Sequence, residues 1–304
     1  MNTRVRAERI PIGEAVRYWV DDTCWAEIAG LDGELDRRLA SADGWTAPER
    51  MTRGLARGSR RSLDALVELF SRSGLAVEGP AAAPIASLRL AVAGSGMLAR
   101  AVAQALLRAG ATQLQVLDPQ PPDPFIWPSS PHATGADALV RALRPRHRVQ
   151  VRAATSVMDL ASAGTDLVLV APGRAEADRW LLEQLVRHDL THMVLGCHRD
   201  VGRIGPLVMP GRTPCVGCQD LARTRHDPHW PAVLSQLDRA QARPQPTLLQ
   251  WVAARTVLEV GWLARSLARA EHWQGRVELV DLHYPQQREV NFRAHPDCGC
   301  VWSP

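Results

Sequence analysis

The stretch "AVAGSGMLARAV", residues 91–102, decides the fold of this chain. It begins as a buried strand and ends as a helix, and Gly94 and Gly96 lie in the turn between them. The first glycine allows a tight turn, the second lets a phosphate approach the backbone, and Ala99 is small enough for helix packing. Asp118 closes the next apolar run about twenty residues later, where an acid accepts a ribose hydroxyl. The pattern predicts Gly94, Gly96 and Asp118 as nucleotide-binding residues; the alternative is a vestigial turn that binds nothing.

Strand-like and helical runs alternate outward from this turn. The apolar runs are 88–94, 113–119, 148–153, 165–172 and 192–197, and helical runs at 97–110, 136–143 and 175–188 separate them. Further along we expect a hairpin at 201–214, helices at 219–239 and 247–270, and strands at 276–282 and 288–294. Such alternation is typical of a doubly wound parallel sheet, so the sequence predicts a Rossmann-like α/β fold with helices on both faces.

The first 78 residues follow a different pattern. A strand-like run at 15–20 precedes helical stretches at 31–41 and 62–73, and the second helix has one apolar face and ends before Gly74. Short strands with helices predict a small winged-helix-like module. The sequence thus predicts two domains, residues 1–78 and 85–304, joined by the linker "GPAAAP" at 79–84.

The composition excludes several kinds of chemistry. The chain contains no lysine, so all 36 basic residues are arginine, and Schiff-base formation, a lysine base and a P-loop lysine are ruled out. These arginines are spread along the chain, so the net charge of +4 is not by itself a nucleic-acid signature. No signal peptide and no membrane span is evident, so we expect a soluble cytoplasmic protein with reduced thiols.

Four of the six cysteines form two tight pairs. "PCVGCQD" supplies Cys215 and Cys218, and "CGC" near the C-terminus supplies Cys298 and Cys300. Each pair has a glycine between its sulfurs, and four thiolates from two such turns make a closed tetrahedral zinc site. The alternatives are a redox dithiol at Cys215 and Cys218, or two unrelated pairs. We predict a structural zinc ion bound by all four.

Two other residues near these motifs have two interpretations each. Cys197 ends an apolar run, which favours core packing over a catalytic thiol. His295 stands close to Cys298 and is either a surface histidine, the interpretation we favour, or a group that supports the metal site. Cys24 has no motif around it.

These motifs together resemble the ThiF/MoeB superfamily of ubiquitin-activating-enzyme-like adenylyltransferases. The segment "GPLVMPGRTPCVGCQDLARTRHDPHWPAVLSQL" with the terminal "HPDCGC" resembles a narrower group, the actinobacterial ThiF-like proteins of the bacteriocin cyclodehydratase or leader-peptide-binding type in azole-modified peptide pathways. The resemblance covers residues 85–304, and residues 1–78 resemble more weakly the winged-helix peptide-recognition element attached to such proteins. It implies a peptide or protein partner for that module, and a homodimer.

The chain departs from the superfamily at the residues that handle charge. Active members place an Arg-Gln pair after the second strand, where this chain has "PPDPFIWPSSPH" at 121–132, and a lysine where it has "TGADAL" at 134–139. Gly173 and Arg174 occupy the positions of the magnesium-binding Asp-Asn pair. No cysteine lies between Cys218 and Cys298 to carry sulfur. These departures predict a degenerate adenylation site, no catalytic residues, and doubtful binding of ATP and magnesium.

The sequence therefore favours a ThiF-like pseudoenzyme that binds a peptide or partner protein. One alternative is an active adenylyltransferase that uses Arg100 or Arg174 in unusual roles. A nicotinamide-dependent oxidoreductase that uses the glycine turn is weaker, since no catalytic acid is evident and the cysteine pairs stay unexplained. The last alternative is a DNA-binding regulator acting through Arg57, Arg60 and Arg61, although such arginines are more simply a solvated face.

Overall fold

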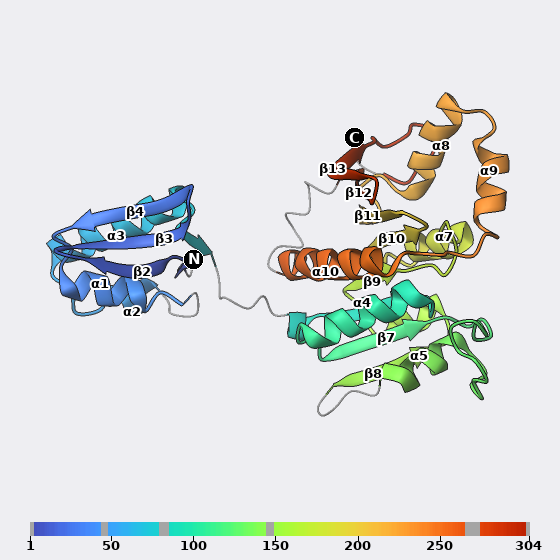
Figure 1. The fold of residues 1–304 in the computed structure, drawn as a ribbon, viewed down its shortest axis with the longest axis horizontal. Coiled ribbons are helices and arrows are strands. Elements are labelled where there is room, and N and C mark those ends of the chain that lie inside the picture. The colour runs from blue at the N-terminus through green and yellow to red at the C-terminus, as the bar shows by residue number, and fades with distance from the viewer. Residues whose placement is uncertain (1–2, 44–47, 79–84, 144–148, 265–273, 302–304) are drawn as a thin grey trace. The chain divides into compact units, whose positions relative to one another are not determined.

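The computed structural model describes residues 3–43, 48–78, 85–143, 149–264 and 274–301. The chain forms two compact units, Met1–Ala83 and Pro84–Pro304 (Figure 1), and each is described by itself. The expected linker at 79–84 lies outside the described residues.

The N-terminal unit is built on a three-stranded antiparallel sheet with β3 at its centre (Figure 1). Its strands are β2 Glu8–Ile12, β3 Ala15–Asp21 and β4 Cys24–Ala29, while β1 Thr3–Val5 pairs with β5 Ala76–Glu78. Its helices are α1 Gly33–Ala40, α2 Pro48–Met51 and α3 Arg57–Arg72. Helix α3 begins at Arg57 rather than Ser62, because its exposed first turn has no apolar residue to reveal helical spacing. That the unit is a winged-helix module stays a prediction.

A buried aromatic pair and a carboxylate hold this unit together. The rings of Tyr18 and Phe70 meet edge to face with their centroids 4.7 Å apart. The Tyr18 hydroxyl donates to Asp36 Oδ1 at 2.6 Å, and the Arg9 guanidinium donates to the same oxygen at 2.8 Å. The hydrogen bond from Arg9 lowers the pKa of Asp36 in spite of burial. Strands β2 and β3 are thereby fixed to α1.

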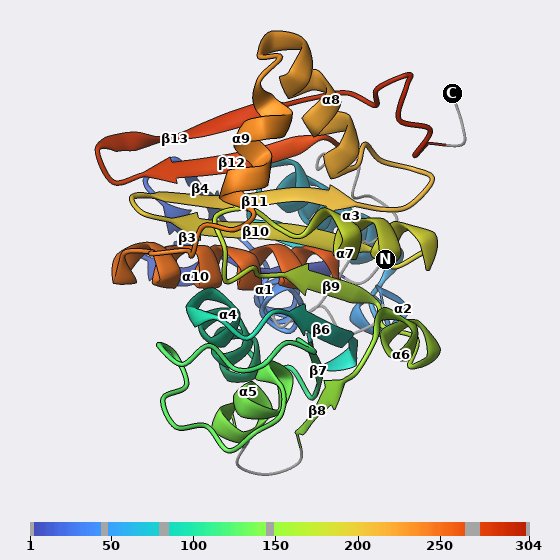
Figure 2. The same cartoon turned by 90° about the vertical axis from the view of Figure 1, so that its right-hand side faces the viewer.

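The second unit contains an eight-stranded sheet in the order β13-β12-β11-β10-β9-β6-β7-β8 (Figures 1 and 2). Its strands are β6 Arg89–Ala93, β7 Gln113–Leu117, β8 Gln150–Ala154, β9 Leu167–Val170, β10 His192–His198, β11 Val201–Val208, β12 Arg276–Asp281 and β13 Tyr284–Asn291. Strands β8, β7, β6, β9 and β10 are parallel, and β11 to β13 continue the sheet antiparallel. The predicted α/β fold with a mainly parallel sheet is confirmed.

Helices cover both faces of this sheet. One buried cluster joins it to α4 Met97–Arg108, α5 Gly135–Leu143 and α10 Pro246–Leu263, and the other joins it to α6 Val157–Ser162, α7 Arg179–Arg187 and the start of α8 Val216–His226. The remaining helices are the short 3-10 turn η1 Ile85–Ser87 and α9 Trp230–Leu237. In the described part of the chain, no helix is both long and apolar enough to cross a membrane.

The expected hairpin at 201–214 is wrong. Residues Val201–Val208 form a single strand, β11, which pairs with β10 on one side and β12 on the other. The reversal of the chain lies before it, at Arg199 and Asp200, where Arg199 has a φ of +52°. The dipeptide Gly205-Pro206 suggested a turn, but the apolar residues around it are buried within the sheet.

The turn that joins β6 to α4 depends on a glycine at position 94. Gly94 has a φ of +123°, and a Cβ there would lie 2.2 Å from the carbonyl oxygen of Ala171, which follows β9. Its N–H donates to the Leu117 carbonyl of the neighbouring strand β7 at 2.8 Å. Three strand ends therefore meet at one residue that has no room for a side chain.

We expect Gly94→Ala to destabilise the second unit by about 3 kcal/mol, since it combines backbone strain with overlap against a buried carbonyl. The matched control is Gly110→Ala, where φ is +98° but nothing lies within 4 Å of the added Cβ. It should lose only about 1–2 kcal/mol from backbone strain. Urea denaturation followed by tryptophan fluorescence measures both, and equal losses would show that the contact with Ala171 is unimportant.

Candidate functional site

A cavity of about 710 Å³ opens at the carboxyl ends of β6, β7 and β9. This is the usual ligand position in an open α/β sheet, because loops from neighbouring strands diverge there. Its lining brings together the residues singled out in the sequence: Gly94, Gly96, Asp118, Gly173 and Arg174.

The two glycine loops touch through their backbones. A Cβ at Gly96 would lie 3.0 Å from the Gly173 Cα, a tight contact, whereas a Cβ at Gly173 would meet its nearest atom, the Gly96 Cα, only at 4.0 Å. Gly96 is also the N-cap of α4 and supplies no capping side chain. The N–H groups of the first helical turn are therefore left without a side-chain acceptor from the cap.

Asp118 is held inside the glycine turn. The Ser95 hydroxyl donates to its Oδ2 at 2.6 Å, and the Gln120 N–H donates to its Oδ1 at 3.2 Å. Burial raises the pKa of Asp118 in spite of these hydrogen bonds. Gly135 packs directly against Ser95 and Asp118, where a Cβ would lie only 2.2 Å from Ser95 Oγ, so this position has no room for a side chain. The carboxylate thus supports the turn while still lining the cavity.

Acidic residues outnumber arginines in the lining of the cavity. Among the described residues it contains five acids, Asp118, Asp123, Glu176, Asp178 and Asp238, and one arginine, Arg174. Glu176 is paired with Arg203 and Arg179, which lie outside this lining. Arg174 donates to the Asp238 carbonyl oxygen at 2.8 Å. Arg100, the other arginine considered from the sequence, lies over the Trp127 ring at 5.5 Å from its centroid and does not line the cavity.

The four paired cysteines converge although more than eighty residues separate the two pairs. All four sulfur atoms lie within 4.8 Å of one another; Cys215 and Cys298 approach to 3.5 Å, and Cys218 and Cys300 to 3.3 Å. In a ZnS₄ tetrahedron with bonds of about 2.3 Å, the sulfurs would lie about 3.8 Å apart. The donor set and its spacing therefore fit one tetrahedral ion.

The surroundings of the sulfurs favour the thiolate at Cys218 and disfavour it at Cys298 and Cys300. The backbone N–H of His295 donates to Cys218 Sγ at 3.2 Å, which helps to lower the pKa of this thiol against the effect of burial. Burial, together with the neighbouring thiols, raises the pKa of Cys300 to about 12. A metal ion would supply the positive charge that such a cluster needs to lose its protons. Gly217 allows the close approach, since a Cβ there would lie 3.3 Å from two of the sulfurs.

His295 is not the surface histidine that the sequence suggested. Its side chain is only 9% exposed, because the loop after β13 folds against the cysteine cluster. The other two cysteines lie apart from this cluster. Cys197 is buried, and burial raises the pKa of its thiol to about 12, which suits core packing and not nucleophilic attack. The Cys24 thiol donates to the Ser73 carbonyl oxygen at 3.2 Å.

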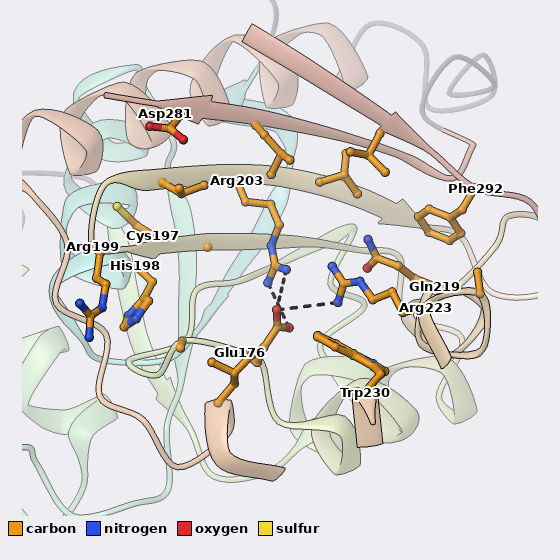
Figure 3. A pocket seen from close by; sticks show the side chains of 18 of the residues that line it. Glu176, Cys197, His198, Arg199, Arg203, Gln219, Arg223, Trp230, Asp281 and Phe292 are labelled. Carbon is orange, nitrogen blue, oxygen red and sulfur yellow. Dashed lines mark hydrogen bonds and ion pairs between the residues drawn. The ribbon is translucent and has the colours of Figure 1, made fainter. Parts of the chain in front are cut away.

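Sequence reasoning missed a second cavity of about 940 Å³ (Figure 3). It lies between strands β10 to β13 and helices α8 and α9, and Glu176 lines it as well as the first cavity. Arg199, Asp200 and Arg203 lie close together in the sequence, as do Arg223 and Asp227, but only the tertiary structure brings the two groups together with Glu176.

The chain combines a mixed α/β sheet, covered by helices on both faces, with a four-cysteine cluster, and solved structures share its fold. Among solved structures, the chain is similar to *E. coli* MccB with ATP, at 13% identity and a TM-score of 0.60, covering 99% of this chain and 100% of MccB. MccB with AMPCPP and MccA has a TM-score of 0.61 at 12% identity, again covering 99% and 100%. A heterocyclase with substrate and cofactor has a TM-score of 0.56 at 12% identity, covering 99% of this chain and 39% of that one.

No protein-family model matches the chain, and no curated protein matches it in sequence. The structural comparisons nevertheless confirm the predicted resemblance at the level of fold. The chain has the fold of MccB, a microcin C7 biosynthetic enzyme.

We expect the purified chain to contain about one zinc ion, bound by Cys215, Cys218, Cys298 and Cys300. Cys298→Ser should release the metal and lower the unfolding temperature, because binding free energy at such a site is also folding free energy. Elemental analysis and thermal unfolding measure both effects. Cys24→Ser, a change at a cysteine outside the cluster, should leave the zinc content unchanged. Zinc-free wild-type protein, or full occupancy in Cys298→Ser, would remove the zinc assignment.

Proposed function

We propose that this chain is a peptide-binding or partner-binding component with a ThiF-like fold, a structural zinc ion and no adenylation activity. The observation that carries this proposal is the lining of the cavity at the glycine turn. Among the described residues it has one arginine and five acids, of which only Glu176 is ion-paired with arginines outside the lining. An azole-type peptide modification pathway is the setting that the sequence resemblance implies, and a homodimer is the assembly.

Adenylation needs the opposite charge. The α-phosphate gains negative charge in the transition state, and cations or a metal ion must stabilise it. Arg174 is the one arginine in the lining among the described residues, and the absence of lysine from the sequence leaves no lysine ammonium group. Gly173 stands where a magnesium-binding carboxylate is expected, and it packs against Gly96. ATP would thus meet a cavity lined by more acids than arginines.

A peptide partner suits the N-terminal unit. Strand β4 is an edge of the three-stranded sheet, so an extended peptide can add to it by backbone hydrogen bonds. The other edge, β2, contains Pro11, which has no N–H to donate. Beside the β4 edge, the outer face of the sheet exposes Trp19 and Trp25, which are 39% and 50% exposed. MccB has been solved with MccA, and the heterocyclase with its substrate.

Two other functions keep some support. An active adenylyltransferase is favoured by the intact glycine turn and by the size of its cavity, about 710 Å³. A DNA-binding regulator is favoured by Arg57, Arg60 and Arg61, which are exposed at the start of α3. Salt-dependent binding to duplex DNA would support the regulator.

We expect no magnesium-dependent exchange of pyrophosphate into ATP above background. Losing one preorganised donor typically lowers the rate by about 10²–10³, and this cavity lacks several. The measurement uses labelled pyrophosphate with a carboxylate substrate, an active ThiF/MoeB-type enzyme as positive control, and Asp118→Ala as the matched variant. Robust exchange by the wild type that Asp118→Ala abolishes would replace this proposal with the adenylyltransferase.

We expect residues 1–78 to carry the affinity for the partner. The probe is the fluorescently labelled MccA peptide of the structural neighbour, and anisotropy is measured with the full chain and with residues 85–304. Removal of the N-terminal unit should abolish binding, since it removes the free edge of β4, while zinc content reports whether the second unit is still folded. Equal affinity with and without residues 1–78 would refute peptide recognition by this unit.

A further inference from the structure

The second cavity has a polar end and an apolar wall. Helices α8 and α9 flank it on one side and strands β10 to β13 on the other (Figure 3). The apolar wall is formed by Ala222, Leu237, Val277, Leu279, Val290 and Phe292. At the polar end, Arg203, Arg223, Glu176 and Trp230 turn toward one another (Figure 3).

The group of charged side chains at the polar end of the cavity contains more guanidiniums than carboxylates. Three guanidiniums, those of Arg179, Arg203 and Arg223, face two carboxylates, those of Glu176 and Asp220. All five side chains are 30% exposed or less. A buried charge without a counter-ion is costly, because the interior solvates it less well than water does. One positive charge is left over.

The surplus charge falls on Arg223. Arg203 donates to Glu176 at 2.8 Å and Arg179 to Asp220 at 2.7 Å, so two of the three guanidiniums have their own carboxylate. The nearest carboxylate oxygens to Arg223 Nη1 lie at 3.7 and 3.9 Å, beyond hydrogen-bonding distance. Arg223 Nη1 is buried and has no hydrogen-bond partner among the described residues.

The position of Arg223 is fixed by its neighbours. Its guanidinium lies over the Trp230 ring at 4.4 Å from the centroid, and the indole N–H of Trp230 donates to Asp220 Oδ1 at 3.0 Å. Gln219, one turn earlier on α8, points into the cavity beside it (Figure 3). An oriented guanidinium next to an amide can bind a planar anionic group.

A carboxylate suits this end better than a phosphate. A single surplus positive charge matches one negative charge, whereas a phosphate carries nearly two and would face Glu176. The neighbouring wall is apolar, so the group that carries the anion should be apolar as well. The other acids of the lining already have partners. Asp200 lies 3.1 Å from His283 Nε2, Asp281 lies 3.8 Å from Arg288, and Asp227 Oδ1 accepts the backbone N–H of His229 at 2.9 Å.

We propose that the second cavity binds a carboxylate on an apolar chain, with Arg223 as its counter-ion and Trp230 holding Arg223 in place. The expected source is a peptide, and this choice rests on the proposed function. The carboxylate belongs either to the C-terminus of that peptide or to an acidic side chain, and both sources present the same group to Arg223.

The test measures binding of three small probes to the full chain by isothermal titration calorimetry. They are N-acetyl-leucyl-phenylalanine, its C-terminal amide, and N-acetyl-leucyl-glutamyl-phenylalaninamide. We expect saturable binding of the free acid, with the amide about tenfold or more weaker. Comparable binding of the glutamyl amide would assign the side chain as an alternative source, and weak binding would assign the C-terminus. Because no probe is a precursor peptide, failure of leader binding by the N-terminal unit would not change this result.

Arg223→Gln should weaken binding of the acid by about tenfold to a hundredfold, since hydrogen bonds to charged groups are worth about 1.5–3 kcal/mol. Arg223→Lys should keep more of the affinity, and Arg187→Gln, which removes an exposed arginine of α7 paired with Glu183, should keep all of it. The unfolding temperature of ligand-free Arg223→Gln should not fall, because the variant removes the uncompensated charge.

Four results would overturn the proposal. They are equal affinity for acid and amide, unchanged binding by Arg223→Gln, no saturation by the acid at millimolar concentration, and displacement of the acid by an equal concentration of inorganic phosphate.

Discussion

The close approach of two backbones at Gly94 is the constraint on which the second unit depends. The Ala171 carbonyl oxygen occupies the place where a side chain at residue 94 would begin, and the same crowding recurs between Gly96 and Gly173. Because β6 lies between β7 and β9, this contact sets how the ends of three neighbouring strands diverge. The position of the first cavity follows from it, whatever the cavity binds.

The two cavities of the second unit share Glu176 but differ in their charged residues. Among the described residues, the first cavity is lined by five acids and one arginine. In the second cavity, the Arg223 guanidinium lies 3.7 and 3.9 Å from its nearest carboxylate oxygens, so it is ion-paired without a hydrogen bond to either. Arginine suits this position, because its planar group can stack on an aromatic ring and still bind an anion. In a chain without lysine, every basic side chain has this property.

Much of the fold could be predicted because buried parallel strands are nearly continuous apolar runs, as in "LRLAVAG" and "TDLVLVAP". The cysteine cluster was also predictable, since each pair is tight and spaced by glycine. Strand β11 was misjudged as a hairpin because its continuity depends on pairing with β10 and β12, and the pairing with β10 passes an irregularity at Gly205-Pro206. The charged group around Glu176 could not be predicted. Its members come from the loop before α7 and from α7, β11 and α8, and only tertiary packing brings them together.

Helix α8 connects the cysteine cluster to the second cavity. Cys215 is its N-cap, Cys218 lies in its first turn, and Gln219 and Arg223 follow on the same helix. The cluster attaches the start of α8 to the loop after β13, while Arg223 and Trp230 attach its later turns to α9. A helix held at both ends has little freedom to turn, so Arg223 stays over the apolar wall even without a hydrogen bond to a carboxylate. A metal ion in the cluster would therefore act on the cavity through the position of α8, although no cysteine of the cluster lines it. Loss of the cysteine cluster should therefore also change the position of Arg223, because Cys218 and Arg223 both lie on α8.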